Sequence, residues 1–177
     1  TINLENVNLI NNNANGSTAK IRGGAVLNVK EGTVITGKDS YVGIECVAST
    51  VNIYDGAEIY MNGTSSYNGC LVGACANGVV NVYGGYGKGV KGGFIAMTSG
   101  GTINVYGGEW IANTDGSVGN NSNVYVLTSQ NNKYESGYSG PSIINVYGGT
   151  LLGGMDAWIL NDVNTEVAEL NIYGGTF

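Results

Sequence analysis

The chain has 177 residues, of which 42% are hydrophobic and only 11% charged, so one domain with a sizeable core is expected. The net charge of −6 and the scattered Lys and Arg residues argue against a nucleic-acid partner, which needs clustered basic side chains. The sequence has no apolar run long enough for a membrane-spanning helix, and it has no His for a Ser-His or Cys-His nucleophile.

A short phrase recurs seven times: an aliphatic residue, Asn, a second aliphatic residue and, in most copies, Tyr-Gly-Gly. The mean spacing between copies is 28 residues. An internal period of this size indicates a solenoid, in which each repeat stacks on its neighbours. The central residues of the seven copies are Asn3, Asn28, Asn52, Asn81, Asn104, Asn145 and Asn171.

Each phrase alternates as a β-strand does, so its aliphatic pair faces a core while Asn and the following residue face outward. The glycines predict a bend, because Gly adopts positive φ without a steric penalty. A short second strand is expected after the bend, at residues 34–35, 58–60, 94–96, 110–112 and 151–152. A third apolar run precedes the next phrase in several repeats, at residues 42–47, 70–76, 124–127 and 157–160.

These elements predict an all-β fold, a parallel β-solenoid (right-handed β-helix) of about seven coils that forms one domain over residues 1–177. Right-handedness is expected because parallel crossovers nearly always have that hand. Helical periodicity is not visible, so no helical cap is expected, and uncapped end coils would offer open strand edges to other strands.

Two segments are predicted to leave the coils as insertions. One is residues 86–93, and the other is the polar stretch 113–142 in the longest repeat, which contains the only proline, Pro141. Loops on a rigid scaffold often carry binding sites. A solvated excursion without a ligand is the simpler interpretation of the longer segment.

The outward position after the phrase is aromatic in five successive repeats. In-register coils would stack these rings at about 4.8 Å. The strip is either a self-stacking ladder that protects the sheet or a surface for a sugar polymer or partner. Its members are Tyr54, Tyr83, Tyr106, Tyr147 and Tyr173, and Glu5 and Lys30 hold the same position in the first two repeats. The seven central asparagines are expected to form a structural ladder of side-chain amides.

Cys46 and Cys75 each lie six residues before the central Asn of their repeats. A buried thiol stack between adjacent coils is therefore expected, with Cys acting as a small hydrophobic residue. Without His or a second close Cys pair, the sequence supports no zinc site, and we expect no other metal or cofactor.

Paired carboxylates could hydrolyse a glycosidic bond, and two pairs are candidates. Asp156 and Asp162 lie near Trp158, whereas Glu58 and Glu109 follow the glycine bend in non-adjacent coils, about 9–10 Å apart. Solvated surface charge is the simpler explanation of both pairs, so no catalytic residue and no enzymatic activity are expected.

The phrase Val-Asn-Val-Tyr-Gly-Gly at residues 80–85 resembles repeats of right-handed parallel β-helix proteins, the pectate-lyase-like superfamily. It is most similar to Gly/Asn-rich repeat segments of secreted or cell-surface microbial proteins. The resemblance implies the architecture and an extracellular location. Enzymes of that superfamily group Asp with basic residues or His, whereas this chain has Arg22 as its single Arg and no Asp cluster.

The expected function is therefore a non-catalytic extracellular structural β-solenoid, either a rod segment or a self-assembling fibre subunit that stacks end to end through its open ends. The alternative is a carbohydrate-binding module or adhesin that holds a polysaccharide or cell-surface glycan through the Tyr strip and the 113–142 loop. Neither nucleic acid nor membrane insertion is expected.

Overall fold

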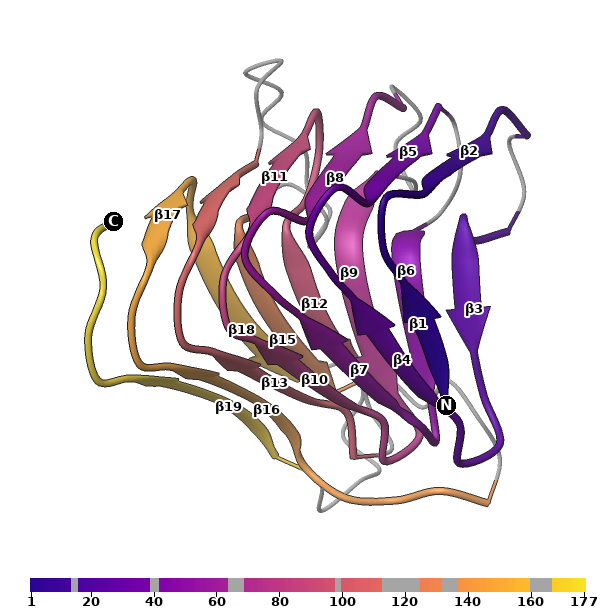
Figure 1. Cartoon of the computed structure of the whole chain (residues 1–177). Helices are drawn as coiled ribbons and strands as arrows, with labels where there is room; N and C mark the ends of the chain where they lie inside the picture. Colours follow the sequence, from indigo (N-terminus) through magenta and orange to yellow (C-terminus); the bar gives the residue numbers. More distant parts are fainter. Residues whose placement is uncertain are drawn as a thin grey trace.

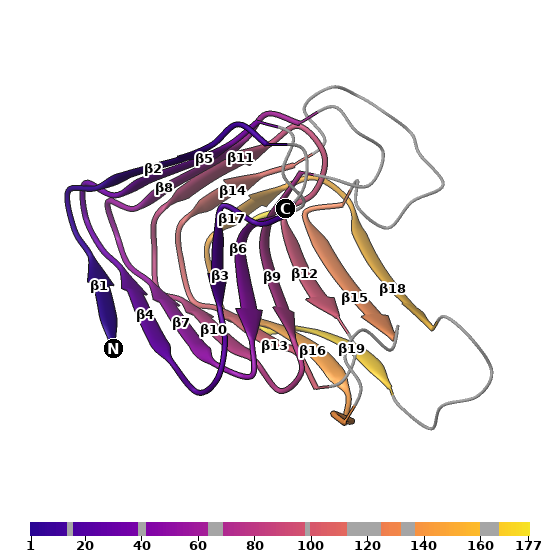
Figure 2. The same cartoon turned by 90° about the vertical axis from the view of Figure 1, so that its right-hand side faces the viewer.

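The computed structural model describes residues 1–13, 16–38, 42–63, 69–97, 100–112, 125–131, 137–159 and 167–177. Within these ranges the regular structure is entirely β, and the strands form three parallel sheets. The chain passes through the three sheets in turn and then begins the next coil, so the sheets enclose a three-sided rod (Figures 1 and 2). The prediction of an all-β parallel β-solenoid is confirmed.

Sheet A contains the repeated phrases. Its strands, in spatial order, are β1 (Ile2–Leu4), β4 (Val26–Val29), β7 (Thr50–Ile53), β10 (Val79–Val82), β13 (Thr102–Val105), β16 (Ser142–Val146) and β19 (Ala168–Ile172).

Sheet B follows the glycine bend. Its strands are β2 (Asn8–Asn11), β5 (Val34–Gly37), β8 (Glu58–Met61), β11 (Tyr86–Gly89), β14 (Glu109–Ile111) and β17 (Thr150–Leu152). Sheet C closes each coil with β3 (Ala19–Ile21), β6 (Val42–Val47), β9 (Cys70–Cys75), β12 (Phe94–Met97), β15 (Leu127–Asn131) and β18 (Met155–Ile159).

The rod makes about five turns, fewer than the seven coils expected. The seven phrases do form the seven strands of sheet A, but sheets B and C contain six strands each in the described residues. A turn is complete only when the chain has passed through all three sheets. Counting phrases therefore includes the coil that begins at β19, which has no strand in sheet B or sheet C among the described residues.

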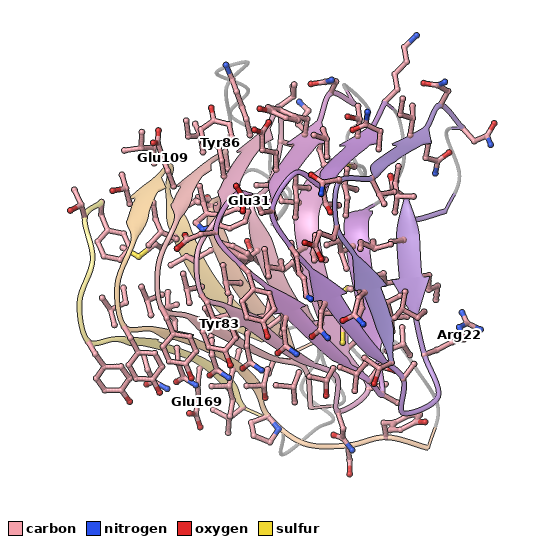
Figure 3. All side chains as sticks on the ribbon, in the orientation of Figure 1. Arg22, Glu31, Tyr83, Tyr86, Glu109 and Glu169 are labelled. Carbon is pink, nitrogen blue, oxygen red and sulfur yellow. The ribbon has the colours of Figure 1, made fainter. Side chains whose placement is uncertain are left out.

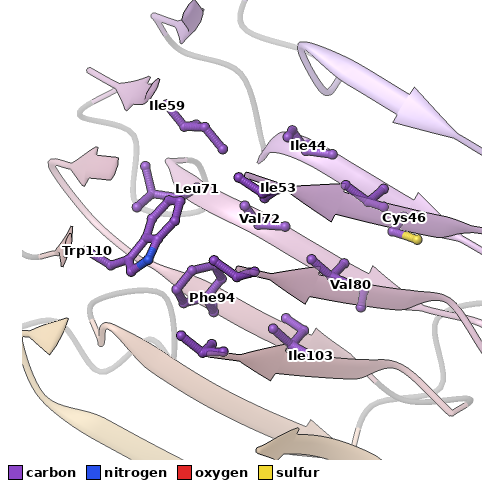
Figure 4. Packing of buried hydrophobic residues seen from close by; sticks show 14 of the residues in the cluster. Ile44, Cys46, Ile53, Ile59, Leu71, Val72, Val80, Phe94, Ile103 and Trp110 are labelled. Carbon is purple, nitrogen blue, oxygen red and sulfur yellow. The ribbon is translucent and has the colours of Figure 1, made fainter. Parts of the chain in front are cut away.

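The interior of the rod is a continuous apolar column to which all three sheets contribute. Ile53, Val80 and Ile103 from sheet A are fully buried, and they face Ile44 from sheet C and Ile59 from sheet B (Figure 4). This is the alternation that the phrase predicts, since the residues on either side of each Asn point inward. Parallel strands stacked in this way bury a core that no single coil could form alone.

In the Tyr-Gly-Gly copies of the phrase, the two glycines are required for different structural reasons. At Gly107, an added Cβ would lie 2.7 Å from the carbonyl oxygen of Tyr83 in the coil below, so coil-to-coil packing leaves no room for a side chain. At Gly108, φ is +93°, a conformation that L side chains rarely adopt. The phrase therefore encodes both the close approach of coils and the direction of the bend.

The prediction that residues 86–93 form an insertion is wrong. Tyr86–Gly89 is β11, which pairs in parallel with β8 on one side and β14 on the other. The segment predicted to be the second strand of that repeat, residues 94–96, belongs to β12 in sheet C.

The sequence pattern does not reveal this strand, because Gly87 occupies the core position where most other coils have an aliphatic side chain. The opposing residue in β14 is Trp110, which is fully buried. An added Cβ at Gly87 would lie 2.4 Å from Trp110 Cε3 and 2.9 Å from Leu71 Cδ1. The indole therefore fills the volume that a side chain at residue 87 would take, and it packs edge-on against Phe94 with centroids 4.8 Å apart (Figure 4).

We expect Gly87→Val to lower the free energy of unfolding by about 1–3 kcal/mol, because overpacking a filled core forces side chains and backbone to shift. Urea titration would measure the change. In a Trp110→Leu background the same substitution should be less harmful, since the smaller side chain leaves room. Equal losses in both backgrounds would contradict the assignment of Gly87 to the volume beside Trp110.

Candidate functional site

The asparagines of sheet A form one continuous ladder of side-chain amides on the outer surface. Each Nδ2 donates to the Oδ1 of the Asn in the preceding coil, at distances of 2.8–3.1 Å, from Asn28 onto Asn3 through to Asn171 onto Asn145. All six bonds run in the same direction along the rod. The inner amides are half-buried, so their hydrogen bonds link successive coils in a region that is only partly accessible to solvent.

The tyrosines form a second ladder beside the amides. Tyr83, Tyr106, Tyr147 and Tyr173 stack with centroids 5.0–5.3 Å apart and interplanar angles of 8–11°, and Tyr54 continues the stack at 5.3 Å and 21°. Tyr83, Tyr106 and Tyr147 remain 44–47% exposed. Because the faces of these inner rings are directed at neighbouring rings, their edges and hydroxyl groups form the exposed surface.

The ladder position is charged in the first two coils. Lys30 Nζ lies 3.8 Å from Glu5 Oε2, and both side chains are largely exposed. An exposed pair at this distance stabilises the fold by at most about 1 kcal/mol. The aromatic ladder therefore begins at Tyr54, in the third coil.

The candidate carboxylates Glu58 and Glu109 lie on the outer face of sheet B. Both are in register with Tyr86, one strand on either side, so strand β11 lies between the two carboxylates. Figure 3 labels Tyr86 and Glu109 on this face. Glu58 is also engaged locally, because it accepts a hydrogen bond of 2.6 Å from the hydroxyl of Tyr60. That bond, with smaller effects of burial and of the nearby charge, raises the pKa of Tyr60 to about 12.

Other candidates cannot be placed. Asp162 and residues 113–124 and 132–136 of the long polar stretch lie outside the described residues, and so do the side chains of Asp156 and Trp158. The described parts of that stretch include β15 in sheet C and the start of β16 in sheet A, so residues 113–142 are not a loop throughout.

The predicted stack of Cys46 and Cys75 is wrong. Cys46 pairs with Ala74, and Cys75 pairs with Val47. The turn after β9 has three residues and the turn after β6 has two, so counting back from the Asn is wrong by one position. A one-residue shift moves a side chain to the other face of a strand.

The thiols are accordingly found in different surroundings. Cys46 lies in the main core, whereas Cys75 is buried in a separate small cluster with Val47 and Ala76. Burial raises the pKa of Cys46 to about 11 and that of Cys70 to about 12. Both thiols are therefore held in the unreactive protonated form at neutral pH.

Sequence reasoning missed a polar cluster on sheet C. Glu45 is 5% exposed, receives a hydrogen bond from Ser17 and lies 2.7 Å from Lys20 Nζ on the neighbouring strand. Alternation of apolar and polar residues along the strand does not reveal this cluster, because β6 is buried along its whole length. The pairing compensates the buried carboxylate and explains why the charge is tolerated.

Among the described residues, no group of three or more His, Cys, Asp or Glu side chains could hold a metal ion. The same part of the chain contains no helix long and apolar enough to cross a membrane.

The chain was compared with models of protein families, with curated proteins and with solved structures, and none of them matches. The geometry of the ladders and of the outer faces of the sheets is therefore the basis for assigning a function.

We expect Asn104→Ala to lower the free energy of unfolding by about 1–2 kcal/mol, because it leaves Asn81 Oδ1 and Asn145 Nδ2 without their partners. Thr102→Ala is the matched control, since Thr102 is half-buried on the same face of the same strand. Urea titration measures both changes. If the amide ladder contributes little to stability, Asn104→Ala and Thr102→Ala should lower the free energy of unfolding by the same amount.

The pKa of Tyr60 predicts a change in stability at high pH. Its pKa in the fold, about 12, lies above the ordinary value of 10, so the fold favours the protonated phenol. This contribution is fully present below pH 10 and disappears as the pH rises from about 10 to 12.

Tyr60→Phe should therefore lose less stability than the unmodified chain over that interval, measured by urea titration at each pH. Glu58→Gln removes the acceptor carboxylate and should return the pKa of Tyr60 toward 10, visible as earlier phenolate absorbance. Unchanged titration in Glu58→Gln would disprove the assigned cause.

Proposed function

We propose that the protein is a structural β-solenoid: a stiff, non-catalytic, extracellular rod whose coils continue by stacking further parallel strands on the edges of its outer coils. The observation that carries this proposal is the amide ladder. It runs without interruption from Asn3 to Asn171, with every bond in the same direction.

A ladder with one direction has two complementary ends. Among the described residues, no Asn accepts a hydrogen bond from the Nδ2 of Asn3, and none donates one to the Oδ1 of Asn171. Strands β1 and β19 are likewise the outermost strands of sheet A, each paired on one side only. Stacking the β19 edge of one copy on the β1 edge of the next would keep the strands parallel and extend the ladder.

Apolar side chains support the same arrangement. Ile2 in β1 and Ile172 in β19 occupy core positions, because their register partners Leu27 and Val146 are buried. Both are more than 40% exposed, which is unusual for core positions. A stacked coil would cover them, and heterologous contacts of this kind generate open filaments. Any polypeptide with the same repeat could supply that coil.

The location and the lack of catalysis are part of the proposal. The composition supports an extracellular protein through its low charge and its many Gly, Asn and Tyr residues. The resemblance to pectate-lyase-like repeat segments of secreted or cell-surface microbial proteins rests on the repeated phrase. On the outer face of sheet B, strand β11 lies between Glu58 and Glu109, so these two carboxylates are not an adjacent pair.

A second candidate function, carbohydrate recognition by a binding module or adhesin, is favoured by the exposed Tyr ladder. Stacking of the rings alone does not require their edges and hydroxyl groups to be exposed to solvent. The five tyrosines are instead 36–68% exposed, along one side of the rod.

Negative-stain electron microscopy over a concentration series tests the structural proposal. We expect the 177-residue chain to form filaments of uniform width that lengthen with concentration. Ile2→Glu and Ile172→Glu should each shorten them, because a charge at an end coil opposes stacking. Lys88→Glu, which adds negative charge on the exposed side of sheet B, should leave their length unchanged.

Dispersed short rods at every concentration would refute end-to-end stacking of this chain. Filaments that all three variants form equally well would show that the contacts are not at the ends.

A further inference from the structure

The outer face of sheet A between β7 and β16 contains three parallel columns of side chains. A third column runs beside the asparagine column on the side away from the tyrosines, and it is made of the outward residues two positions before each Asn: Thr50, Val79, Thr102 and Ile143. All are half-buried, and no position in the three columns over these four strands is charged. In a chain of net charge −6, this is a continuous uncharged surface.

This surface repeats its hydrogen-bonding groups once per coil. An Asn amide has two N–H donors and an oxygen with two lone pairs. Each inner Asn of the ladder uses one donor and one lone pair on its neighbours, so one of each remains. Each Tyr adds a hydroxyl group that both donates and accepts. The steps between tyrosine rings are 5.0–5.3 Å.

We propose that this face binds an extended, uncharged β-1,4-linked glycan that lies parallel to the solenoid axis, with one sugar unit for each coil. The proposal rests on the carbohydrate-recognition candidate and specifies its ligand; it does not depend on end-to-end stacking. In an extended β-1,4-linked chain, each sugar advances by a distance close to the step of the Tyr ladder. Each sugar therefore lies over one Tyr hydroxyl and one Asn amide, and because neighbouring sugars of such a chain alternate in orientation, every second sugar makes the same contacts.

Other glycans fit this face less well. An α-1,4-linked glucan coils and advances less per sugar, so its hydroxyl groups lose register with the ladder after a few coils. A polyanionic glycan is disfavoured by the negative charge of the chain, and the columns from β7 to β16 contain no Lys or Arg to compensate it.

The stacked rings determine how the glycan is held. A sugar usually packs its C–H face on an exposed aromatic face, but the faces of Tyr83, Tyr106 and Tyr147 are turned toward neighbouring rings. The glycan therefore meets ring edges and hydroxyl groups. Binding should then depend on the phenolic oxygen, whereas the stability of the ladder depends on the ring.

Replacement of Tyr by Phe separates these two roles, because Phe keeps the stacking ring and loses the hydroxyl. Isothermal titration of the whole chain with cello-oligosaccharides of increasing length is the test. We expect affinity to rise with length until the sugars span the tyrosine ladder, and we expect no binding of malto-oligosaccharides or polygalacturonate.

The triple variant Tyr83→Phe, Tyr106→Phe, Tyr147→Phe should bind cellohexaose at least roughly tenfold more weakly, since one lost hydrogen bond reduces affinity roughly two- to tenfold. Its melting temperature should stay close to that of the unmodified chain. Tyr60→Phe, on the outer face of sheet B, is the matched control and should bind normally.

Three results would overturn the proposal: no binding of any β-1,4-linked oligosaccharide, equal binding of maltohexaose, or unchanged binding by the triple variant. The filament experiment reports on a different surface. Dispersed short rods of the unmodified chain with intact glycan binding would count against the rod alone, and filaments of the unmodified chain without glycan binding would count against this proposal alone.

Discussion

Strict register between successive coils is the constraint on which the rest of the molecule depends. In a parallel sheet, equivalent residues of neighbouring strands lie side by side about 4.8 Å apart, so a pattern repeated in the sequence becomes a column in space. Asn3 pairs with Asn28, Asn28 with Asn52, and the same relation continues to Asn171. A shift by one residue in any coil would turn its aliphatic pair outward and interrupt both ladders. The core, the amide ladder and the Tyr ladder therefore stabilise the same register.

The ladders and the core act in different ways. Burial of Ile, Val and Leu provides the main driving force but has no direction, so it tolerates more than one arrangement. The amide bonds and ring stacks are directional and specify which residue lies above which. Glycine sets how closely coils approach, because a side chain at Gly107 would collide with the backbone of the coil below. Gly87 shows the same principle inside the rod, where the absence of one side chain makes room for Trp110.

The features that could be predicted from the sequence are those encoded by local alternation. The sheet A strands follow from the phrase, because alternating Val, Asn, Val and Tyr residues have one satisfactory arrangement. The features that were missed depend on contacts between coils. Tyr86–Gly89 lacks the aliphatic pattern of a strand because its core volume belongs to a tryptophan from the next coil. The position of Cys75 depends on one additional turn residue, which spacing from the Asn does not reveal. The Glu45–Lys20 pair is likewise created by neighbouring strands rather than by adjacent residues.

The same register connects the two proposed functions. A rod lengthens by adding copies of the chain, and each added copy repeats the four-strand face from β7 to β16, on which every coil presents one Tyr, one Asn and one β-branched residue. The faces of successive copies are separated by the coils of Glu5 and Lys30, so a long linear glycan would meet them as several linked sites and its affinity would grow with rod length through effective concentration. A filament would then bind long glycans far more tightly than a single chain binds short ones. The two functions share one geometric cause, yet they use different surfaces: the rod uses its ends, and the glycan uses its side.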